Sequence, residues 1–358
     1  MGGQGGQQTA EFCTYFDRSY LSRGLALYGS LVRYATPFHL WVLCLDSTTR
    51  EVLESLDLPG VRLIPLEILE AGDPELAAIK RTRSRIEYYF TCTPCLPRFI
   101  FQQHDPDIRS LTYLDADLCF YANPAPLLAA IDDHSIAVIP HHIVAPPPEY
   151  RTLELNIYGK YNVGWLSFKA DETAMRCIET WRAQCLDWCF DRAEGGRYAD
   201  QKYLDDWPDR YPEVEVVTHR GANVGPWNVR SYRLERAEAG VTVDGESLLF
   251  YHFHNLKRLA RGVYDPGFSW YRIVPDPILL HDIYEPYLRS LRNAESVLRQ
   301  FPQQSGPFNG VRETSPRARS RRYLPRAISS AWRWWRICTG IAAGRYLVES
   351  HGKIIHAR

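Results

Sequence analysis

The sequence lacks the features that mark a membrane-spanning, secreted or disulfide-stabilised protein. Its 358 residues contain no apolar run of about 18 residues, so no bilayer-spanning helix is predicted. The first residues, MGGQGGQQTAE, have neither a basic region nor an apolar stretch, and we expect a flexible leader over 1–10 and no signal peptide. Nine cysteines, an odd number spread over a long chain, give no disulfide framework. These absences favour a cytoplasmic protein.

Charge is balanced over the whole chain but not along it. The 42 Lys and Arg match the 42 Asp and Glu, yet residues 312–358 hold 11 basic and two acidic residues, which leaves 31 basic and 40 acidic residues before them. Arginines there alternate with Trp332, Trp334 and Trp335, a pattern typical of a helix that lies at a membrane surface. We expect a linker over 301–320 and a basic amphipathic helical tail over 321–358 that contacts the inner face of a membrane; a solvated tail and nucleic-acid binding are the alternatives.

Apolar strand-like segments alternate with helix-like segments through the rest of the chain. Breaks are expected at Pro94 and Pro97, between a helix over 80–90 and another that runs to His104. This alternation predicts an α/β domain over 11–300, with a doubly wound, mainly parallel, Rossmann-like sheet whose ligands lie beyond the carboxyl ends of the strands. The strands are predicted at 11–16, 38–46, 61–66, 110–121, 135–140 and 161–169, and the longest helices at 18–34 and 175–192.

The segment YLDADLCFY carries the most informative chemistry. A buried strand that ends in two carboxylates, Asp115 and Asp117, would present both on one face. Such a pair is costly unless a cation lies between the two carboxylates, and hard oxygen ligands suit Mg²⁺ or Mn²⁺ bridging a diphosphate. A solvated turn or a helix cap is the alternative for so short a motif.

Four motifs in order give a resemblance over roughly residues 11 to 270. They are FCTYFDRSY, the DxD of Asp115 and Asp117, YNVGWLSF and ADQKYLDDW. The chain resembles the retaining GT-A glycosyltransferases of the family that contains lipopolysaccharide galactosyl- and glucosyltransferases and glycogenin. The resemblance implies a GT-A-type fold with a nucleotide half over 11–121 and an acceptor half over 122–300.

The resemblance also implies roles for residues of the nucleotide half. Asp17 would accept a hydrogen bond from the base and Tyr20 would stack on it, although Asp17 is equally suited to cap the following helix. Arg98, on the helix before the DxD strand, would contact the donor; a salt bridge or solvation is the alternative.

The later motifs imply the sugar-binding residues. Asn162 would contact sugar hydroxyls, and Gly164 would let the backbone approach, with Val163 in place of the family's usual alanine. Asp200 would bind sugar hydroxyls and Gln201 would lie near the anomeric carbon. A buried amide for Asn162 and a helix N-cap for Asp200 are the ordinary interpretations.

A histidine and a lysine complete the expected site. In YHFHNLK the family has a third metal ligand and a diphosphate-binding lysine. His252 and His254 alternate onto the same strand face, so either could be the ligand; we favour His252, with Lys257 for the diphosphate, and interpret His254 as structural. The family's intervening glycine is missing from this segment. Earlier in the chain, Trp227 could line the pocket or pack in the core.

These residues together predict a metal-dependent hexosyltransferase. The donor would be a nucleotide-diphosphate sugar, with UDP favoured. The acceptor would be a glycan or glycolipid, in the biosynthesis of bacterial lipopolysaccharide or another surface glycan. Retention of configuration follows from the resemblance alone. The alternative is a sugar-nucleotide-binding or scaffold protein of the same fold that has lost turnover.

Overall fold

A seven-stranded sheet forms the centre of the protein. The computed structural model describes residues 9–103, 108–130, 132–143, 155–301, 337–341, 343–350 and 353–356. The strand order is β3-β2-β1-β4-β7-β6-β8. Neighbours from β3 to β4 are parallel, β7 is antiparallel to both β4 and β6, and β8 is parallel to β6. The strands are β1 Ala10–Phe16, β2 Phe38–Cys44, β3 Val61–Pro65, β4 Ser110–Leu114, β6 Ile136–Pro140, β7 Tyr161–Lys169 and β8 Val214–Val216.

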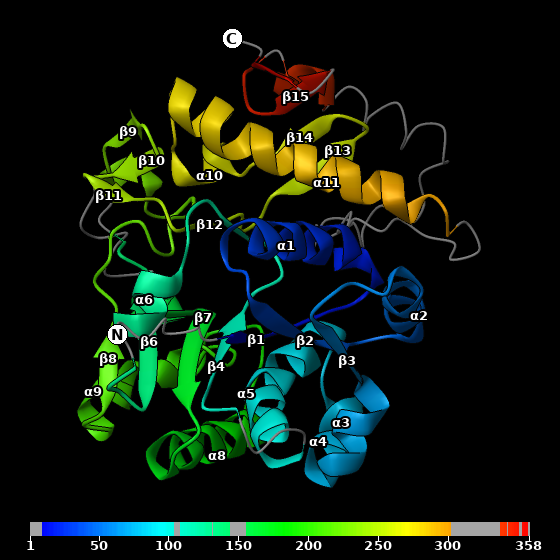
Figure 1. Ribbon diagram of the computed structural model, residues 1–358, viewed down its shortest axis with the longest axis vertical. Helices are drawn as coiled ribbons and strands as arrows, with labels where there is room; N and C mark the ends of the chain where they lie inside the picture. Colours follow the sequence, from blue (N-terminus) through cyan, green and yellow to red (C-terminus); the bar gives the residue numbers. More distant parts are fainter. Residues whose placement is uncertain are drawn as a thin grey trace, which may run out of the picture.

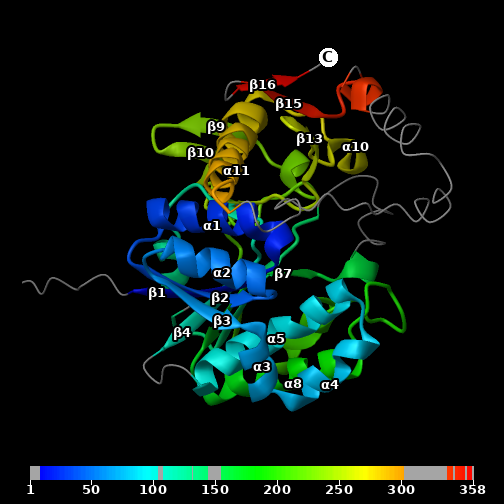
Figure 2. The same ribbon diagram turned by 90° about the vertical axis from the view of Figure 1, so that its right-hand side faces the viewer.

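Helices cover both faces of this sheet, as Figure 2 shows. On one face lie α1 (Leu21–Tyr34) and α2 (Ser47–Leu56), and on the other α3 (Leu66–Gly72), α4 (Pro74–Ile79), α5 (Arg85–Gln103) and α8 (Glu172–Asp187). Each face has its own apolar core, built from alternate strand residues: Phe12 and Leu40 pack toward α1, whereas Cys13 and Trp41 pack toward α5. The predicted doubly wound, mainly parallel α/β sheet is therefore confirmed.

The predicted break at Pro94 and Pro97 is wrong. Both prolines lie inside the continuous helix α5. Each proline removes one backbone hydrogen bond, but α5 packs along α8 (Figure 1) and buries Cys92, Leu96 and Ile100 in the core. Burial of this face outweighs the local preference, as tertiary packing often does.

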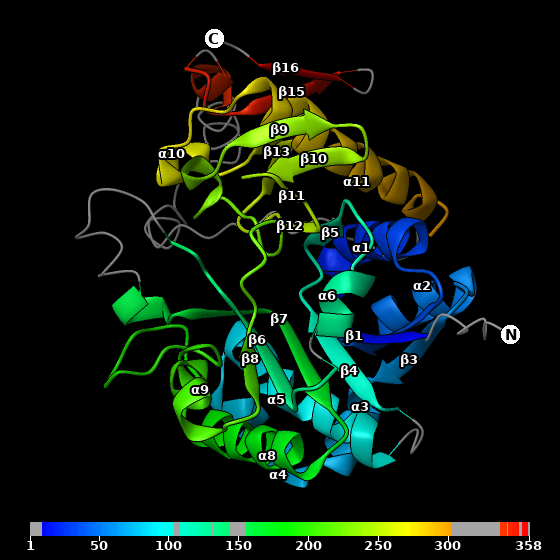
Figure 3. The same ribbon diagram turned by 60° about the vertical axis from the view of Figure 1, so that its left-hand side comes forward.

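A second layer of small sheets and helices covers α1, as Figure 3 shows from the side. Helix α11 (Glu285–Leu298) lies along α1 (Figure 1). The sheets are β9 (Leu234–Ala237), β10 (Gly240–Val243) and β11 (Glu246–Ser247); β5 (Leu118–Phe120) with β12 (Phe250–His252); and β13 (Lys257–Ala260), β14 (Val263–Asp265), β15 (Leu347–Ser350) and β16 (Lys353–His356). Further short helices include α6 (Ala125–Ala130), α9 (Trp207–Arg210), α10 (Phe268–Tyr271) and a π-helical turn at Leu279–Tyr284.

The end of the chain is held by this second layer. Strand β15 pairs with β14, and β16 pairs with β15, both antiparallel. The tryptophans of the predicted amphipathic tail, Trp332, Trp334 and Trp335, and the predicted linker beyond Phe301 lie outside the described residues. Within the described part of the chain, no helix has the length and apolar character needed to cross a bilayer.

Candidate active site

Two carboxylates and a histidine meet at the carboxyl end of β4. Asp115 and Asp117 follow this strand in a turn, and β5 then pairs with β12 so that His252 stands opposite Leu118. The His252 Nε2 atom lies 3.1 Å from Asp117 Oδ1 and 3.6 Å from Asp115 Oδ2. One ligand atom from each of the three lies within 4.8 Å of the others. The carboxylates thus converge as expected, but through a turn rather than on one face of a strand.

Neighbouring groups hold the three side chains in place. The Tyr113 hydroxyl donates to Asp115 Oδ1 at 2.8 Å, and the Phe253 backbone N–H donates to the Asp117 carbonyl at 3.0 Å. A Cβ added at Gly164 would lie 2.7 Å from His252 Cε1, which is closer than real Cβ contacts allow. Glycine at this position therefore gives the imidazole the space to reach both carboxylates.

Burial and charge act in opposite directions on this group. His252 is 2% exposed; burial alone would lower its pKa, but Asp117 and Asp115 outweigh burial and raise it. Burial would also raise the pKa of Asp117, yet His252, His254 and Arg23 lower it. For Asp115 burial dominates, and its pKa is raised. Positive charge between the two carboxylates is thus favoured.

The donor set fits a divalent cation. Two carboxylates and one imidazole are suitable ligands for Mn²⁺ or Mg²⁺. The Asp115 side chain remains 34% exposed, so further ligands can approach from solvent. The site therefore fits a divalent metal whose identity the residues leave open.

His254 lies outside the group of possible ligands. It is exposed, and its ring centroid stands 5.8 Å from that of His252 and 5.8 Å from that of Trp227. Trp227 is 7% exposed and donates its indole N–H to the His141 carbonyl. The structure therefore groups His252, and not His254, with the two aspartates.

The predicted sugar-binding residues lie beside this group. Asn162 is buried, and its Oδ1 accepts from the Gly164 N–H at 2.9 Å while its Nδ2 lies 3.1 Å from His141 Nε2. Gln201 Oε1 accepts from the Val163 N–H at 3.2 Å, and its Nε2 donates to the Tyr158 carbonyl at 2.8 Å. Both amides thus have protein partners.

Asp200 is a buried acid close to the same carboxylates. It is 4% exposed, and burial raises its pKa to about 7; a hydrogen bond with Thr93 opposes this effect and the charge of Asp115 adds to it. The Thr93 hydroxyl also contacts the Tyr15 hydroxyl at 3.0 Å. The ordinary role weighed for Asp200, a helix N-cap, is not the one observed, because Gln201 precedes the next helical turn and makes no capping bond.

Asp17 performs the capping role that its sequence position suggests. Its Oδ1 accepts from the Ser19 N–H at 2.9 Å, and it is 5% exposed. The Tyr89 hydroxyl donates to Asp17 Oδ2, and Arg85 lies 3.8 Å away from the same oxygen. Tyr20 is half-buried with the Arg23 guanidinium over its ring, 4.4 Å from the centroid.

Arg98 makes the salt bridge weighed as its alternative. Its Nε lies 2.6 Å from Glu179 Oε1, in the contact between α5 and α8. Only six residues separate the end of α5 from β4, so this half of the helix lies near the amino end of that strand. The opposite half of α5 holds Tyr89 and Thr93, which contact the carboxyl end of β1. Lys257 begins β13, half-buried.

Sequence reasoning missed Arg23 and His141. Arg23, in the first turn of α1, is 6% exposed, and its Nη2 donates to the Leu256 carbonyl at 2.7 Å. His141 is buried, and burial lowers its pKa to about 3. No local pattern distinguishes either residue from a solvated surface residue, because both acquire partners from segments far away in the sequence.

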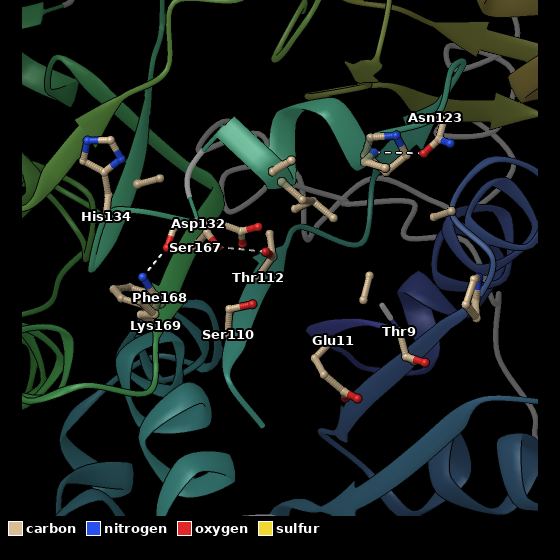
Figure 4. Close-up of a pocket in the computed structure, with 18 of the residues that line it drawn as sticks. Thr9, Glu11, Ser110, Thr112, Asn123, Asp132, His134, Ser167, Phe168 and Lys169 are labelled. Carbon is tan, nitrogen blue, oxygen red and sulfur yellow. Dashed lines mark hydrogen bonds between the residues drawn. The ribbon is translucent and has the colours of Figure 1, made fainter. Parts of the chain in front are cut away.

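A separate cavity of about 210 Å³ lies at the other end of the strands, where β1 and β4 begin (Figure 4). It is lined by residues at the amino ends of β1 and β4, including Glu11 and Ser110. Two of its polar pairs are already satisfied: the Thr112 hydroxyl donates to Ser167 at 3.0 Å, and Lys169 donates to the Asp132 carbonyl. The aspartate–histidine group is not part of this cavity.

Three solved structures similar to this chain are glycosyltransferases. The galactosyltransferase LgtC, in complex with donor and acceptor sugar analogs, is 14% identical and covers 80% of this chain and 95% of its own, with a TM-score of 0.49. Mouse xyloside xylosyltransferase 1 is 16% identical over 69% of this chain and 98% of its own, with a TM-score of 0.46. The glycosyltransferase GlyE of Streptococcus pneumoniae TIGR4 is 11% identical over 86% and 66%, with a TM-score of 0.47.

Sequence comparison gives closer relatives. No protein-family model matches the chain. Two proteins of Bacillus subtilis (strain 168), both named as uncharacterized, are similar over most of their length. YfnD is 27% identical over 297 residues, which cover 82% of this chain and 93% of YfnD. YfnF is 32% identical over 248 residues, 68% of this chain and 81% of YfnF. At this identity and coverage, the chain belongs to the same protein family as YfnF.

Proposed function

We propose that this protein is a metal-dependent glycosyltransferase that moves a hexose from a nucleotide-diphosphate sugar to a glycan or glycolipid. The observation that carries the proposal is the meeting of Asp115, Asp117 and His252 at the carboxyl edge of a doubly wound sheet, where such folds bind their ligands. A divalent cation held by these residues would offset the negative charge that develops on the departing nucleoside diphosphate. The four motifs that resemble GT-A enzymes support the same function.

The chain's own residues would bind and orient the donor. Asp17 and Tyr20 lie at the end of β1, on the side where the base would bind, and Lys257 would contact the diphosphate. Asn162 and Asp200 would bind sugar hydroxyls, because both are buried polar groups beside the carboxylates. Gln201 would lie near the anomeric carbon, held by its bonds to Val163 and Tyr158.

The stereochemical outcome and the acceptor are part of the proposal. We propose transfer with retention, to an acceptor of a surface glycan such as lipopolysaccharide, at the inner face of the membrane. Residues 312–358 contain 11 basic and two acidic residues, and this excess of positive charge supports contact with anionic lipid. A UDP-sugar is the favoured donor.

Thermal unfolding tests the proposal. Wild type and Asp117→Ala would be heated with UDP-, GDP-, dTDP- and CDP-sugars, each with and without Mn²⁺. We expect a Mn²⁺-dependent rise of the unfolding midpoint with one donor, absent in Asp117→Ala, because a ligand that binds only the folded state stabilises it. Asp133→Ala, in an exposed loop before β6, is the matched control and should keep the rise.

Product analysis then distinguishes an enzyme from a binding protein. Hydrolysis or transfer of the selected sugar shows turnover and its stereochemistry. Binding without any turnover favours the scaffold alternative. No stabilisation by any donor contradicts the proposed function as a whole.

A further inference from the structure

Arg23 is a buried cation beside the proposed metal ligands. It lies in the first turn of α1, just after the carboxyl end of β1, and is 6% exposed. Its guanidinium interacts electrostatically with the Asp117 carboxylate. The same side chain connects α1 to the segment between His252 and Lys257, because its Nη2 donates to the Leu256 carbonyl at 2.7 Å.

One nitrogen of this guanidinium has no acceptor. Arg23 Nη1 is buried and lacks a hydrogen-bond partner. A guanidinium offers five N–H donors, and leaving buried donors of a charged group unpaired costs free energy. Arg23 is therefore a cation, bonded to the Leu256 carbonyl, in a position where a bound anion would complete its hydrogen bonds.

Tyr20 is the more exposed neighbour of this guanidinium. Tyr20 stands one helical turn before Arg23, and the guanidinium lies 4.4 Å from the centroid of its ring. The ring is only half-buried, whereas Arg23 is buried, so a ligand that contacts Tyr20 comes close to the guanidinium. A base at Tyr20 and a cation at Asp117 would place the phosphates of a nucleotide between them.

We propose that Arg23 binds the diphosphate of the nucleotide-sugar donor, with its Nη1 donating to a phosphate oxygen. Guanidinium groups suit phosphate oxygens because they present planar, parallel N–H donors. The proposal rests on the proposed function and adds a second cation, besides Lys257, for the diphosphate. It also assigns Arg23 a positioning effect on Lys257, through its bond to the preceding residue.

Calorimetric titration of the full chain with inorganic pyrophosphate and Mn²⁺ tests this inference, because pyrophosphate carries the phosphates without base or sugar. We expect Arg23→Met to weaken binding of Mn²⁺–pyrophosphate by about 10- to 100-fold, the effect of losing a hydrogen bond to a charged group. Binding of Mn²⁺ alone should be unchanged or tighter, since Arg23 repels a cation at Asp117. A purely structural role would weaken Mn²⁺ binding as well, through displacement of the segment that carries His252.

Two variants make the result decisive. Arg33→Met is the matched control, because Arg33 lies on the same helix over a neighbouring tyrosine ring but is exposed; it should bind as wild type does. Arg23→Gln carries the test if the Met variant unfolds, since it keeps a polar donor without the charge.

Wild-type affinity for Mn²⁺–pyrophosphate in the folded Arg23 variants overturns the inference and leaves the proposed function intact. Failure of the wild type itself to bind Mn²⁺–pyrophosphate or any nucleoside diphosphate overturns both. A loss confined to the Arg23 variants supports both.

Discussion

Replacing Asp200 by asparagine should make the protein more stable while it damages the proposed site. The Asp200 carboxyl is 4% exposed, and burial raises its pKa from 3.8 to about 7. The unfolded chain therefore loses this proton at lower pH than the folded chain does. As pH rises from about 4 to about 7, the free energy of unfolding falls, because ionising the buried carboxyl costs free energy in the folded state. This full ionisation penalty remains at higher pH. Asparagine removes the ionisation and hence the penalty.

The expected size of the effect follows from the shift. Each unit of pKa difference corresponds to about 1.4 kcal/mol, so a rise from 3.8 to about 7 gives a penalty of about 4 kcal/mol at pH 8. At pH 5 most of this penalty has not yet developed. The difference in unfolding free energy between Asp200→Asn and wild type should therefore increase in favour of the variant by about 2 to 3 kcal/mol between pH 5 and pH 8.

Urea unfolding at several pH values, in EDTA to remove metal, measures this difference. Asp57→Asn, the same substitution at an exposed position, is the control. The reasoning would be refuted if Asp200→Asn raised the unfolding free energy by the same amount at pH 5 and pH 8, or lowered it at pH 8. If Asp200 binds sugar hydroxyls, the stabilised variant should also transfer sugar at least about 10-fold more slowly, as expected for a lost hydrogen bond to a charged group.

Three further outcomes are expected. Gly164→Ala should displace His252 and weaken Mn²⁺ binding in calorimetry, at a cost of about 1 to 3 kcal/mol in unfolding free energy; unchanged metal affinity would contradict the contact. Arg182→Ala should lower the unfolding free energy by about 3 to 5 kcal/mol, because it leaves Asp73 buried without its two-bond partner; a loss below about 1 kcal/mol in urea would show that the pair is solvated. Thiol titration of the native protein should detect one fast cysteine, the exposed Cys338, and all nine after unfolding; several fast native thiols would contradict the burial of the other eight.

Much of the fold and the centre of the site could be predicted because their signals are local. Alternating apolar strands and helices predict the sheet, and the carboxylates after a buried strand predict their own convergence. His252 could be assigned over His254 only through resemblance; the structure explains the choice by the pairing of β12 with β5, which no local pattern reveals.

The remaining residues depend on tertiary placement. Arg98 has a partner on α8, and the direction of α5 relative to β4 places it away from the carboxylates. The prolines of α5 are tolerated because one face of the helix is buried. Arg23 becomes a buried cation only when the segment after β12 folds onto α1. Each of these results depends on contacts between segments distant in the sequence, which periodicity and motif spacing do not record.

The pairing of β14 with β15 has a practical consequence for dissecting the basic segment. Strand β14 has β13 on one side, which begins at Lys257, and β15 on the other. Deleting everything after Phe301 would remove the arginines together with two strands, and would leave β14 as an unpaired edge one strand away from the proposed phosphate-binding lysine. A shortened protein that lost both lipid binding and activity would therefore say little about membranes. Charge-reversing substitutions within 312–336, which leave 347–356 in place, separate the two effects.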